Sequence, residues 1–368
     1  MTRVGDFQTY NSHVSNDQVW DRVHVVLSQW DLSSDYTRHA GATILSLLVN
    51  CSLPVTVHIF HSEQQALKNP EEYHKNVQRY VEIIEKYSGE LQLHDVVIPS
   101  WVTEENRPRV QTITPAALFR LYIPTILRDI SYVIYLDCDM VVNTDLSRLQ
   151  YLPLDTITIA ACLDSGRNLL VNNVFNSGVY NKIGISCDMY FNSGFMLMNL
   201  EKLRKANCLP DRALDFLRVH PELPCLDQEA LNWLFQRDIF HLDPKYNVTI
   251  GGSSECTEYV QSLRLNQYDD CVLHFTGRDK PWKCFVSDAD LYYWYYLLST
   301  PWGKDEHRFF DYMNRAFFTR SESILHVPYW ILDYSLKDTL KFALYLIGHT
   351  IGNLICYYTK EILGKLKR

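Results

Sequence analysis

The chain has 368 residues, of which 21 % are charged and 47 % hydrophobic, and its formal net charge is −8. This length can bury a full core in one large domain with additions or in two domains. The acidic balance disfavours nucleic acid as a partner. No amino-terminal stretch joins a basic head to an apolar run of signal-peptide length, which predicts a cytoplasmic protein. The ten cysteines include no Cys-x-x-Cys pair, which favours reduced thiols over a disulfide framework or a zinc site.

Short apolar runs alternate with segments of helical periodicity along most of the chain. This alternation predicts βαβ units and a mainly parallel sheet, which later strands make mixed. We therefore expect an α/β domain over residues 1–285. The expected strands are Val23–Ser28, Val55–His61, Leu91–Ile98, Tyr132–Val142, Ile157–Leu163, Met189–Asn199, Phe240–Tyr246 and Cys271–Phe275, and the expected helices are Ala40–Val49, Glu71–Lys86 and Ala116–Leu127.

Residues 286–368 are expected to form a helical carboxyl-terminal region. Apolar residues recur at three- and four-residue steps from Leu336 to Leu366, the pattern of an amphipathic helix. From Leu336 to Arg368 there are six Lys or Arg and two Asp or Glu, so this tail is basic on an otherwise acidic chain. A basic amphipathic tail predicts attachment to an anionic membrane surface. The alternative is a tail helix that packs on the protein's own core or on a partner.

Two carboxylates interrupt the β-branched and aromatic run Tyr132–Val142. Asp137 and Asp139 are two residues apart, so on a continuous strand both side chains project from the same face. Like charges at this spacing repel and lose hydration near a buried sheet, and a divalent cation relieves both costs. We therefore expect a metal site at the carboxyl end of this strand, where open α/β sheets bind their ligands.

A third candidate ligand lies in the later run Cys271–Phe275. A site made of two aspartates and His274 suits Mn²⁺ better than Ca²⁺. Gly277 allows a ligand to approach the backbone closely, and Lys280 offers a cation to a phosphate. The alternative for His274 is an ordinary structural histidine.

Further polar residues lie at the ends of apolar segments. Asn192 opens a buried run and can bind sugar hydroxyls, with a β-bulge as the alternative. Asp227 and Gln228 begin a helix-like segment, where they either cap the helix or face a cleft. Asp164 ends the strand Ile157–Leu163 and is either a cleft carboxylate or a loop residue.

Aromatic residues stand beside carboxylates in the segment Gln29–Tyr36, after the first strand. Such a pair can stack on a base and hydrogen-bond to a ribose, and the candidates are Asp35-Tyr36 and Trp30-Asp31. The sequence contains neither the glycine-rich dinucleotide fingerprint nor the P-loop, which disfavours a hydride-transfer enzyme and a P-loop ATPase.

Five motifs together resemble those of glycosyltransferase family 8, above all its bacterial lipopolysaccharide galactosyl- and glucosyltransferases. They are Ala116–Leu121, Leu136–Asp139, Phe191–Gly194, Asp227–Asn232 and His274–Trp282, and the resemblance spans roughly residues 23–285. It implies a GT-A fold and retaining transfer of a hexose from UDP-galactose or UDP-glucose. The implied acceptor is a glycan or glycolipid, such as the lipopolysaccharide core or another cell-surface glycan. The resemblance also implies Mn²⁺, with Mg²⁺ as the alternative, and peripheral attachment to the inner face of the cell membrane.

The resemblance assigns roles to individual residues of the chain. By motif, the metal ligands are Asp137, Asp139 and His274, the diphosphate contacts are Gly277 and Lys280, the donor-sugar pocket holds Arg120, Asp164, Asn192, Asp227 and Gln228, and the nucleotide-binding turn holds Asp35 and Tyr36. Trp30 rivals Tyr36 for stacking on uracil, because the loop is longer here than the compact turn of the family.

Retention of the anomeric configuration has two possible routes. Double displacement needs a carboxylate nucleophile, as in retaining glycosidases. The matching family position is Gln228, a poor nucleophile, so we expect front-side attack with Gln228 stabilising the cationic sugar. Asp164 or Asp227 is the alternative nucleophile.

Two other functions compete with this interpretation. Asp137-Cys138-Asp139-Met140-Val141 also fits the opening motif of haloacid-dehalogenase-type phosphatases, although that family begins its catalytic domain with this strand and about 130 residues precede it here. A non-catalytic nucleotide-sugar-binding membrane protein would keep the same site without turnover.

Overall fold

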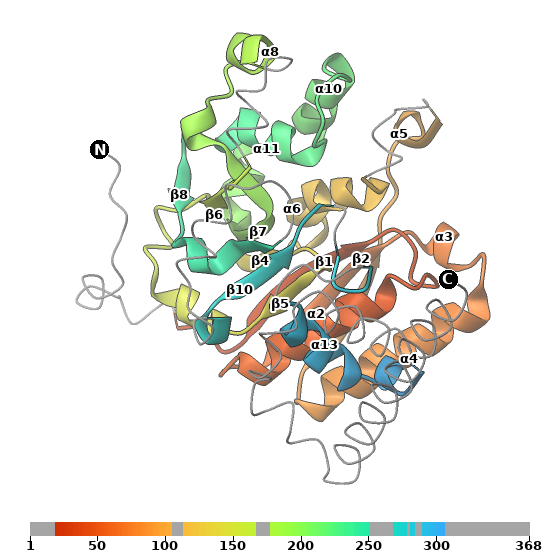
Figure 1. The fold of residues 1–368 in the computed structure, drawn as a ribbon. Helices are drawn as coiled ribbons and strands as arrows, with labels where there is room; N and C mark the ends of the chain where they lie inside the picture. The colour runs from red at the N-terminus through yellow and green to blue at the C-terminus, as the bar shows by residue number, and fades with distance from the viewer. Residues whose placement is uncertain are drawn as a thin grey trace, which may run out of the picture. The chain divides into compact units, whose positions relative to one another are not determined.

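A computed structural model describes residues 19–104, 113–166, 177–250, 268–277, 280–283 and 289–305 (Figure 1). All of them belong to one compact unit, which spans residues 1–312. The predicted amphipathic tail from Leu336 to Leu366 lies outside the described residues. None of the described helices is long and apolar enough to cross a membrane.

A seven-stranded sheet forms the centre of this unit, in the order β3-β2-β1-β4-β7-β6-β8. Parallel pairs join β1 to β2 and β4, β2 to β3, and β6 to β8, whereas β7 runs antiparallel to both β4 and β6. The predicted mixed, mainly parallel α/β architecture is therefore confirmed. The strands are β1 (Val23–Gln29), β2 (Val55–His61), β3 (Glu90–Asp95), β4 (Tyr132–Leu136), β6 (Ile159–Leu163), β7 (Phe191–Asn199) and β8 (Ile239–His241).

Three helices pack together beside the sheet: α2 (Thr37–Asn50), α4 (Pro70–Lys86) and α13 (Asp290–Leu298) (Figure 1). Helix α4 begins at Pro70 because the Asn69 side chain accepts a hydrogen bond from the backbone N–H of Glu72, and because Pro70 has no N–H of its own that would need a partner. Helix α2 is buried along almost its whole length, and its Thr43 hydroxyl donates to the backbone carbonyl of Met140 over 2.7 Å. The helix thereby anchors the chain just after the two aspartates.

Several shorter helices pack against the main sheet and form an apolar core with it. Their apolar side chains pack with Val26, Phe60, Val133 and Tyr135 of the sheet. The contributing elements are η2 (Pro115–Tyr122), α6 (Ile123–Ile126), α8 (Ser177–Lys182), α9 (Leu200–Ala206), α10 (Asp211–Val219) and α11 (Asp227–Phe235). The remaining described helices are α3 (Glu63–Ala66), α5 (Trp101–Glu104), η3 (Leu146–Tyr151), η4 (Cys187–Met189), η5 (Pro244–Asn247), η6 (Tyr268–Asp270) and η7 (Pro301–Asp305).

A second, three-stranded sheet has the order β5-β10-β9. Its strands are β5 (Met140–Val142), β9 (Val248–Ile250) and β10 (Val272–Phe275). Strand β10 pairs antiparallel to β5 and parallel to β9, and Figure 1 shows β5 and β10 next to the main sheet. This sheet brings His274, on β10, close to the chain segment that follows β4.

The prediction of one continuous strand over Tyr132–Val142 is wrong. Strand β4 ends at Leu136, and β5 begins at Met140 in the other sheet. The backbone N–H of Asp137 still bonds to the main sheet, at the carbonyl of Gly194, whereas the carbonyl of Asp139 accepts the N–H of Phe275 in β10. Both strands are buried, so the run of apolar residues hides the change of sheet. Asp137 and Asp139 therefore lie in the link between the sheets and not on one strand face.

Other predicted elements changed type or length. The predicted helix Ala116–Leu127 is a 3₁₀ helix followed by the single α-turn of α6. The predicted strand Phe240–Tyr246 ends at His241, because the Asp243 side chain caps a 3₁₀ turn that begins at Pro244. Strand β9 was not predicted. The predicted strand Val55–His61 is present with the predicted ends, and the other predicted strands and helices are present with ends shifted by a few residues.

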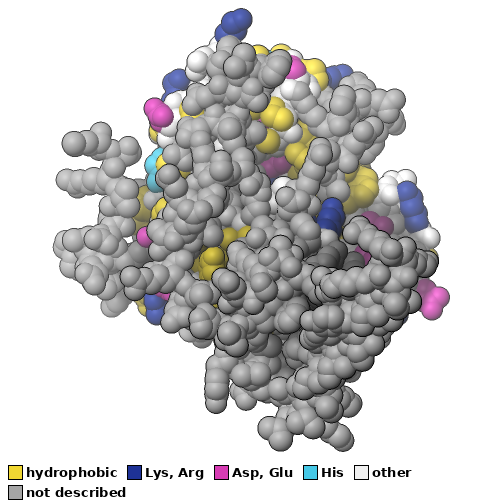
Figure 2. Space-filling view, in the orientation of Figure 1, with side chains coloured by type: hydrophobic (Ala, Val, Ile, Leu, Met, Phe, Trp, Pro, Cys, Tyr) yellow, Lys and Arg dark blue, Asp and Glu magenta, His cyan; other side chains and the backbone are white. Residues whose placement is uncertain are grey.

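The described part of the surface in Figure 2 carries acidic and basic side chains interspersed with hydrophobic ones.

Candidate active site

The polar side chains converge at the point where the strand order reverses. Strand β1 continues to β2 on one side and lies beside β4 on the other, so the segments after β1 and β4 leave the sheet next to each other. Ligands of open α/β sheets bind at such a switch point, outside the carboxyl ends of the strands. The link Asp137–Asp139 lies at this edge.

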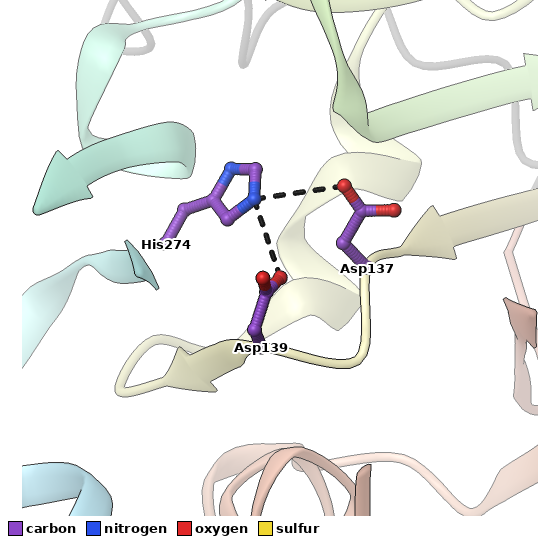
Figure 3. Close-up of side chains that lie close together, drawn as sticks. All are labelled: Asp137, Asp139 and His274. Carbon is purple, nitrogen blue, oxygen red and sulfur yellow. Dashed lines mark ion pairs between the residues drawn. The ribbon is translucent and has the colours of Figure 1, made fainter. Parts of the chain in front are cut away.

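Asp137, Asp139 and His274 form a cluster whose ligand atoms all lie within 4.8 Å of one another. The Nε2 atom of His274 is 3.5 Å from Oδ2 of Asp137 and 3.4 Å from Oδ1 of Asp139 (Figure 3). Two carboxylate oxygens and one imidazole nitrogen make a donor set that suits Mn²⁺ and admits Mg²⁺. The three residues predicted as metal ligands are thus brought together by two different sheets.

A cationic side chain holds the charge of Asp139. Burial opposes its ionisation, but Lys280, which contacts Oδ2 of Asp139, lowers the pKa of Asp139 well below its usual value. Asp139 therefore stays ionised throughout the neutral range, as a metal ligand must.

Arg120 joins Asp137 to the first turn of α11. Its Nη2 is 2.8 Å from Oδ1 of Asp137, and its Nε is 3.1 Å from Oδ2 of Asp227. Nη1 donates to the backbone carbonyl of Ser193 over 2.6 Å, and the guanidinium lies 4.2 Å from the ring centre of Tyr135. Burial disfavours this charge, yet Asp137 and Asp227 raise the pKa of Arg120 above its usual value. Arg120 is thus a fixed buried cation that orients two carboxylates.

The first turn of α11 forms a buried polar wall. The amide of Gln228 accepts the backbone N–H of Ser193 over 3.0 Å and donates to Oδ2 of Asp164 over 3.0 Å. Asn192 donates to the same Asp164 oxygen over 2.8 Å. Asp227 accepts the Ser193 hydroxyl over 2.9 Å. The structure therefore gathers Arg120, Asp164, Asn192, Asp227 and Gln228, all predicted for the sugar pocket, into one network.

The residues predicted to bind the nucleotide lie farther apart from one another. The hydroxyl of Tyr36 lies 3.4 Å from Oδ2 of Asp139, and the residue is 42 % exposed. Trp30 instead packs against Phe119, with ring centres 5.9 Å apart. The Asp35 carboxylate is 76 % exposed and pairs with Arg38. Tyr36 is therefore the aromatic side chain of this loop that borders the metal cluster.

The segment after β10 places the last two predicted residues near the same cluster. Gly277 is exposed and has a φ of 73°, a conformation that favours glycine. Lys280 contacts both Asp139 and the backbone carbonyl of Phe275. Near it, Trp282 stacks on His39 with ring centres 3.7 Å apart.

Asn247 was missed by the sequence reasoning. Its Oδ1 lies 2.9 Å from Nδ1 of His274, on the side of the ring opposite the aspartates. It directly follows the expected strand Phe240–Tyr246 and belongs to none of the motifs that indicated a site. The sequence signal that could have identified it is the amide side chain of Asn247 directly before the short run Val248–Ile250.

A model of glycosyl transferase family 8 matches residues 29–284, most of the described chain. The chain belongs to glycosyltransferase family 8. It is 28 % identical over 282 residues to General stress protein A of Bacillus subtilis, covering 73 % of this chain and 91 % of that protein. It is also 28 % identical over 206 residues to the lipopolysaccharide 1,2-glucosyltransferase of Escherichia coli, covering 55 % of this chain and 59 % of that protein. The protein is thus a glycosyltransferase.

Solved structures confirm the predicted GT-A fold. The galactosyltransferase LgtC, crystallised with donor and acceptor sugar analogs, aligns with a TM-score of 0.59 and 19 % identity, over 76 % of this chain and 96 % of that one. The bifunctional glycosyltransferase WbbM aligns with a TM-score of 0.61 and 19 % identity, over 77 % of this chain and 51 % of that one.

Gly194→Ala is expected to disrupt the metal cluster. A Cβ atom at this position would lie 2.4 Å from His274 and 2.7 Å from Oδ2 of Asp137, so at least one ligand must move. We expect Mn²⁺ affinity, measured by titration of the protein alone, to fall about tenfold or more. Gly41→Ala is the matched control, because its Cβ would lie 2.6 Å from Trp302 instead. Equal Mn²⁺ affinity for the wild type and Gly194→Ala would contradict this prediction.

Asp227 is expected to make the stability of the protein fall as the pH rises. Burial raises the pKa of Asp227 to about 6, despite the opposing effect of Arg120. The unfolded chain releases this proton near pH 4, so the folded state holds an extra proton in between and loses stability up to about pH 6.

The measurement is urea unfolding of the wild type and Asp227→Asn at several pH values. Relative to the variant, the wild type should lose at most about 3 kcal/mol of unfolding free energy between pH 4 and pH 7. Parallel pH profiles for the two proteins would show that Asp227 has an ordinary pKa.

Proposed function

We propose that this glycosyltransferase moves galactose or glucose from a UDP-sugar to a glycan acceptor, with retention of the anomeric configuration. The observation that carries the proposal is the link, through Arg120, between the cluster of candidate metal ligands and the buried polar wall of α11. The cluster of Asp137, Asp139 and His274 is joined by Arg120 to the polar wall that begins at Asp227. A diphosphate held at the cluster would place the attached sugar against this wall.

The cluster residues fit a Mn²⁺ ion, with Mg²⁺ as the alternative, because they offer two carboxylates and an imidazole nitrogen on one side. When bound, the ion supplies Lewis-acid stabilisation of the negative charge that develops on the leaving diphosphate. Lys280 reaches Asp139 and is close enough to the cluster to contact the same diphosphate. Gly277 permits close approach of its backbone, and Tyr36, which borders Asp139, would contact the nucleotide beyond the diphosphate.

Gln228 is the residue proposed to face the reacting carbon. Its amide oxygen carries partial negative charge, which suits it to stabilise a cationic sugar but not to form a covalent bond. The acceptor hydroxyl would attack on the face that UDP leaves, transferring its proton to the departing phosphate as the new glycosidic bond forms.

The two neighbouring carboxylates are alternative nucleophiles for a double displacement. Asp164 accepts hydrogen bonds from Asn192, Gln228 and the backbone of Gly166, and Asp227 is tied to Arg120 and Ser193. These bonds lower the nucleophilicity of both groups, which supports front-side attack.

The acceptor is proposed to be the lipopolysaccharide core or another cell-surface glycan or glycolipid. The name of the Escherichia coli relative supports a lipopolysaccharide acceptor. Attachment of the basic tail to an anionic membrane, at the inner face of the cell membrane, would place the enzyme beside such an acceptor and is proposed from the sequence alone.

The match to glycosyltransferase family 8 excludes the phosphatase alternative. A nucleotide-sugar-binding protein without turnover would use the same network around Gln228 to hold the sugar. A measurement of turnover therefore distinguishes this alternative from an active enzyme.

The direct test is a panel of UDP-sugars assayed for UDP release with Mn²⁺, with Mg²⁺ and with chelator. We expect release from UDP-galactose or UDP-glucose that requires the ion. Asp139→Asn should lower the rate by about 10²-fold or more, because the ligand charge is lost. Asp145→Asn, which changes an aspartate that caps η3 away from the cluster, is the control. Binding of UDP-sugars without any release would favour the non-catalytic protein.

Gln228→Ala is expected to lower kcat by about 10²-fold, while the remaining product keeps the retained configuration. Gln236→Ala is a matched control, because Gln236 is a buried amide at the other end of α11 that bonds to Ser186 and Gly184. Product configuration is read by NMR of the new anomeric proton. A Gln228→Ala enzyme with the wild-type rate would exclude the proposed role.

A further inference from the structure

A chain of buried hydrogen bonds runs from the sugar-side carboxylate to the far side of the metal ligand His274. Asn192 Nδ2 donates to Oδ2 of Asp164 over 2.8 Å, and Asn247 Nδ2 donates to Oδ1 of Asn192 over 2.8 Å. Oδ1 of Asn247 then meets Nδ1 of His274 at 2.9 Å. Both amides and the imidazole are buried.

The direction of every bond in this chain follows from its first member. Asn192 turns its NH₂ group toward Oδ2 of Asp164, an oxygen that also accepts the NH₂ group of Gln228. The amide oxygen of Asn192 then accepts the backbone N–H of Gly194 over 2.9 Å, a donor that cannot be reversed. The same oxygen can face only the NH₂ group of Asn247, which leaves the Asn247 oxygen for His274.

This order determines where His274 carries its proton. An amide oxygen accepts only, so Nδ1 of His274 must be the protonated nitrogen of the neutral ring. Nε2 is then unprotonated, and its lone pair points toward Asp137 and Asp139. Without the bond to Asn247, the neutral ring can carry its proton on Nε2, facing the aspartates. In that tautomer Nε2 has no lone pair to offer a metal.

We propose that Asn247 is a positioning residue that fixes the tautomer and ring direction of His274 for metal binding. The inference rests on the proposed metal site. It also ties that site to the sugar pocket, because Asp164 holds both Asn192 and Gln228. Bonds of this type to metal-binding histidines typically contribute a factor of about 10–100 in metal affinity.

The test compares Asn247→Leu with Asn143→Leu in the full chain. Asn143 is an equally buried amide that bonds to the carbonyl of Tyr268 and the hydroxyl of Tyr296, without contact to His274. Mn²⁺ affinity is measured without nucleotide, from the electron paramagnetic resonance signal of the free ion. We expect at least about tenfold weaker binding in Asn247→Leu and no change in Asn143→Leu.

Asn247→Asp separates tautomer control from simple packing, because it keeps an acceptor for Nδ1–H but loses the donor to Asn192. It should retain most of the Mn²⁺ affinity that the leucine variant loses. If the leucine variant does not fold, Asn247→Ser, which is shorter and polar, takes its place with the same expected loss.

The tautomer itself is read by ¹⁵N NMR of labelled histidines in metal-free protein, with His274→Gln identifying the signal. We expect a protonated Nδ1 in the wild type and loss of this preference in Asn247→Leu. Unchanged Mn²⁺ affinity or an unchanged tautomer in that variant overturns the inference alone. A wild-type protein that binds no Mn²⁺ contradicts the proposed metal site instead.

Discussion

The buried guanidinium of Arg120 is the interaction on which the site depends. Asp137 and Asp227 come from segments 90 residues apart in the chain, yet both lie within 3.1 Å of this one cation. Without it, burial and mutual repulsion would force one carboxylate to take up a proton. With it, Asp137 can present its other oxygen to the metal cluster while Asp227 anchors the helix that carries Gln228.

The charges on the two sides of the site are arranged differently. On the metal side, Asp139 is balanced by Lys280 and faces His274, so its negative charge persists at neutral pH. On the sugar side, Asp164 is held by neutral amides and a backbone N–H. A divalent ion and a diphosphate need strong fixed charge, whereas sugar hydroxyls need oriented donors and acceptors. This difference is the one that the proposed nucleotide-sugar donor would require.

The split of the strand after Leu136 gives the three proposed metal ligands their geometry. Had the strand continued, both aspartates would have stayed on the main sheet, out of reach of β10. Pairing of β5 with β10 instead moves the chain into a second sheet and carries His274 to the aspartates. The loss of regular pairing at Asp137–Asp139 is therefore the feature that makes three ligands converge.

The sequence by itself determined the alternating architecture, the ligand chemistry and the family, because apolar periodicity and short motifs are local properties of the chain. Asp137, Asp139, His274 and Gln228 could all be named from their motifs. Only the tertiary structure decided which partner each acquires. The change of sheet at Leu136 and the bond between Asn247 and His274 depend on pairing between distant segments, which leaves no period in the sequence. Local pattern thus identified the chemical groups, and long-range hydrogen bonding set their direction and charge.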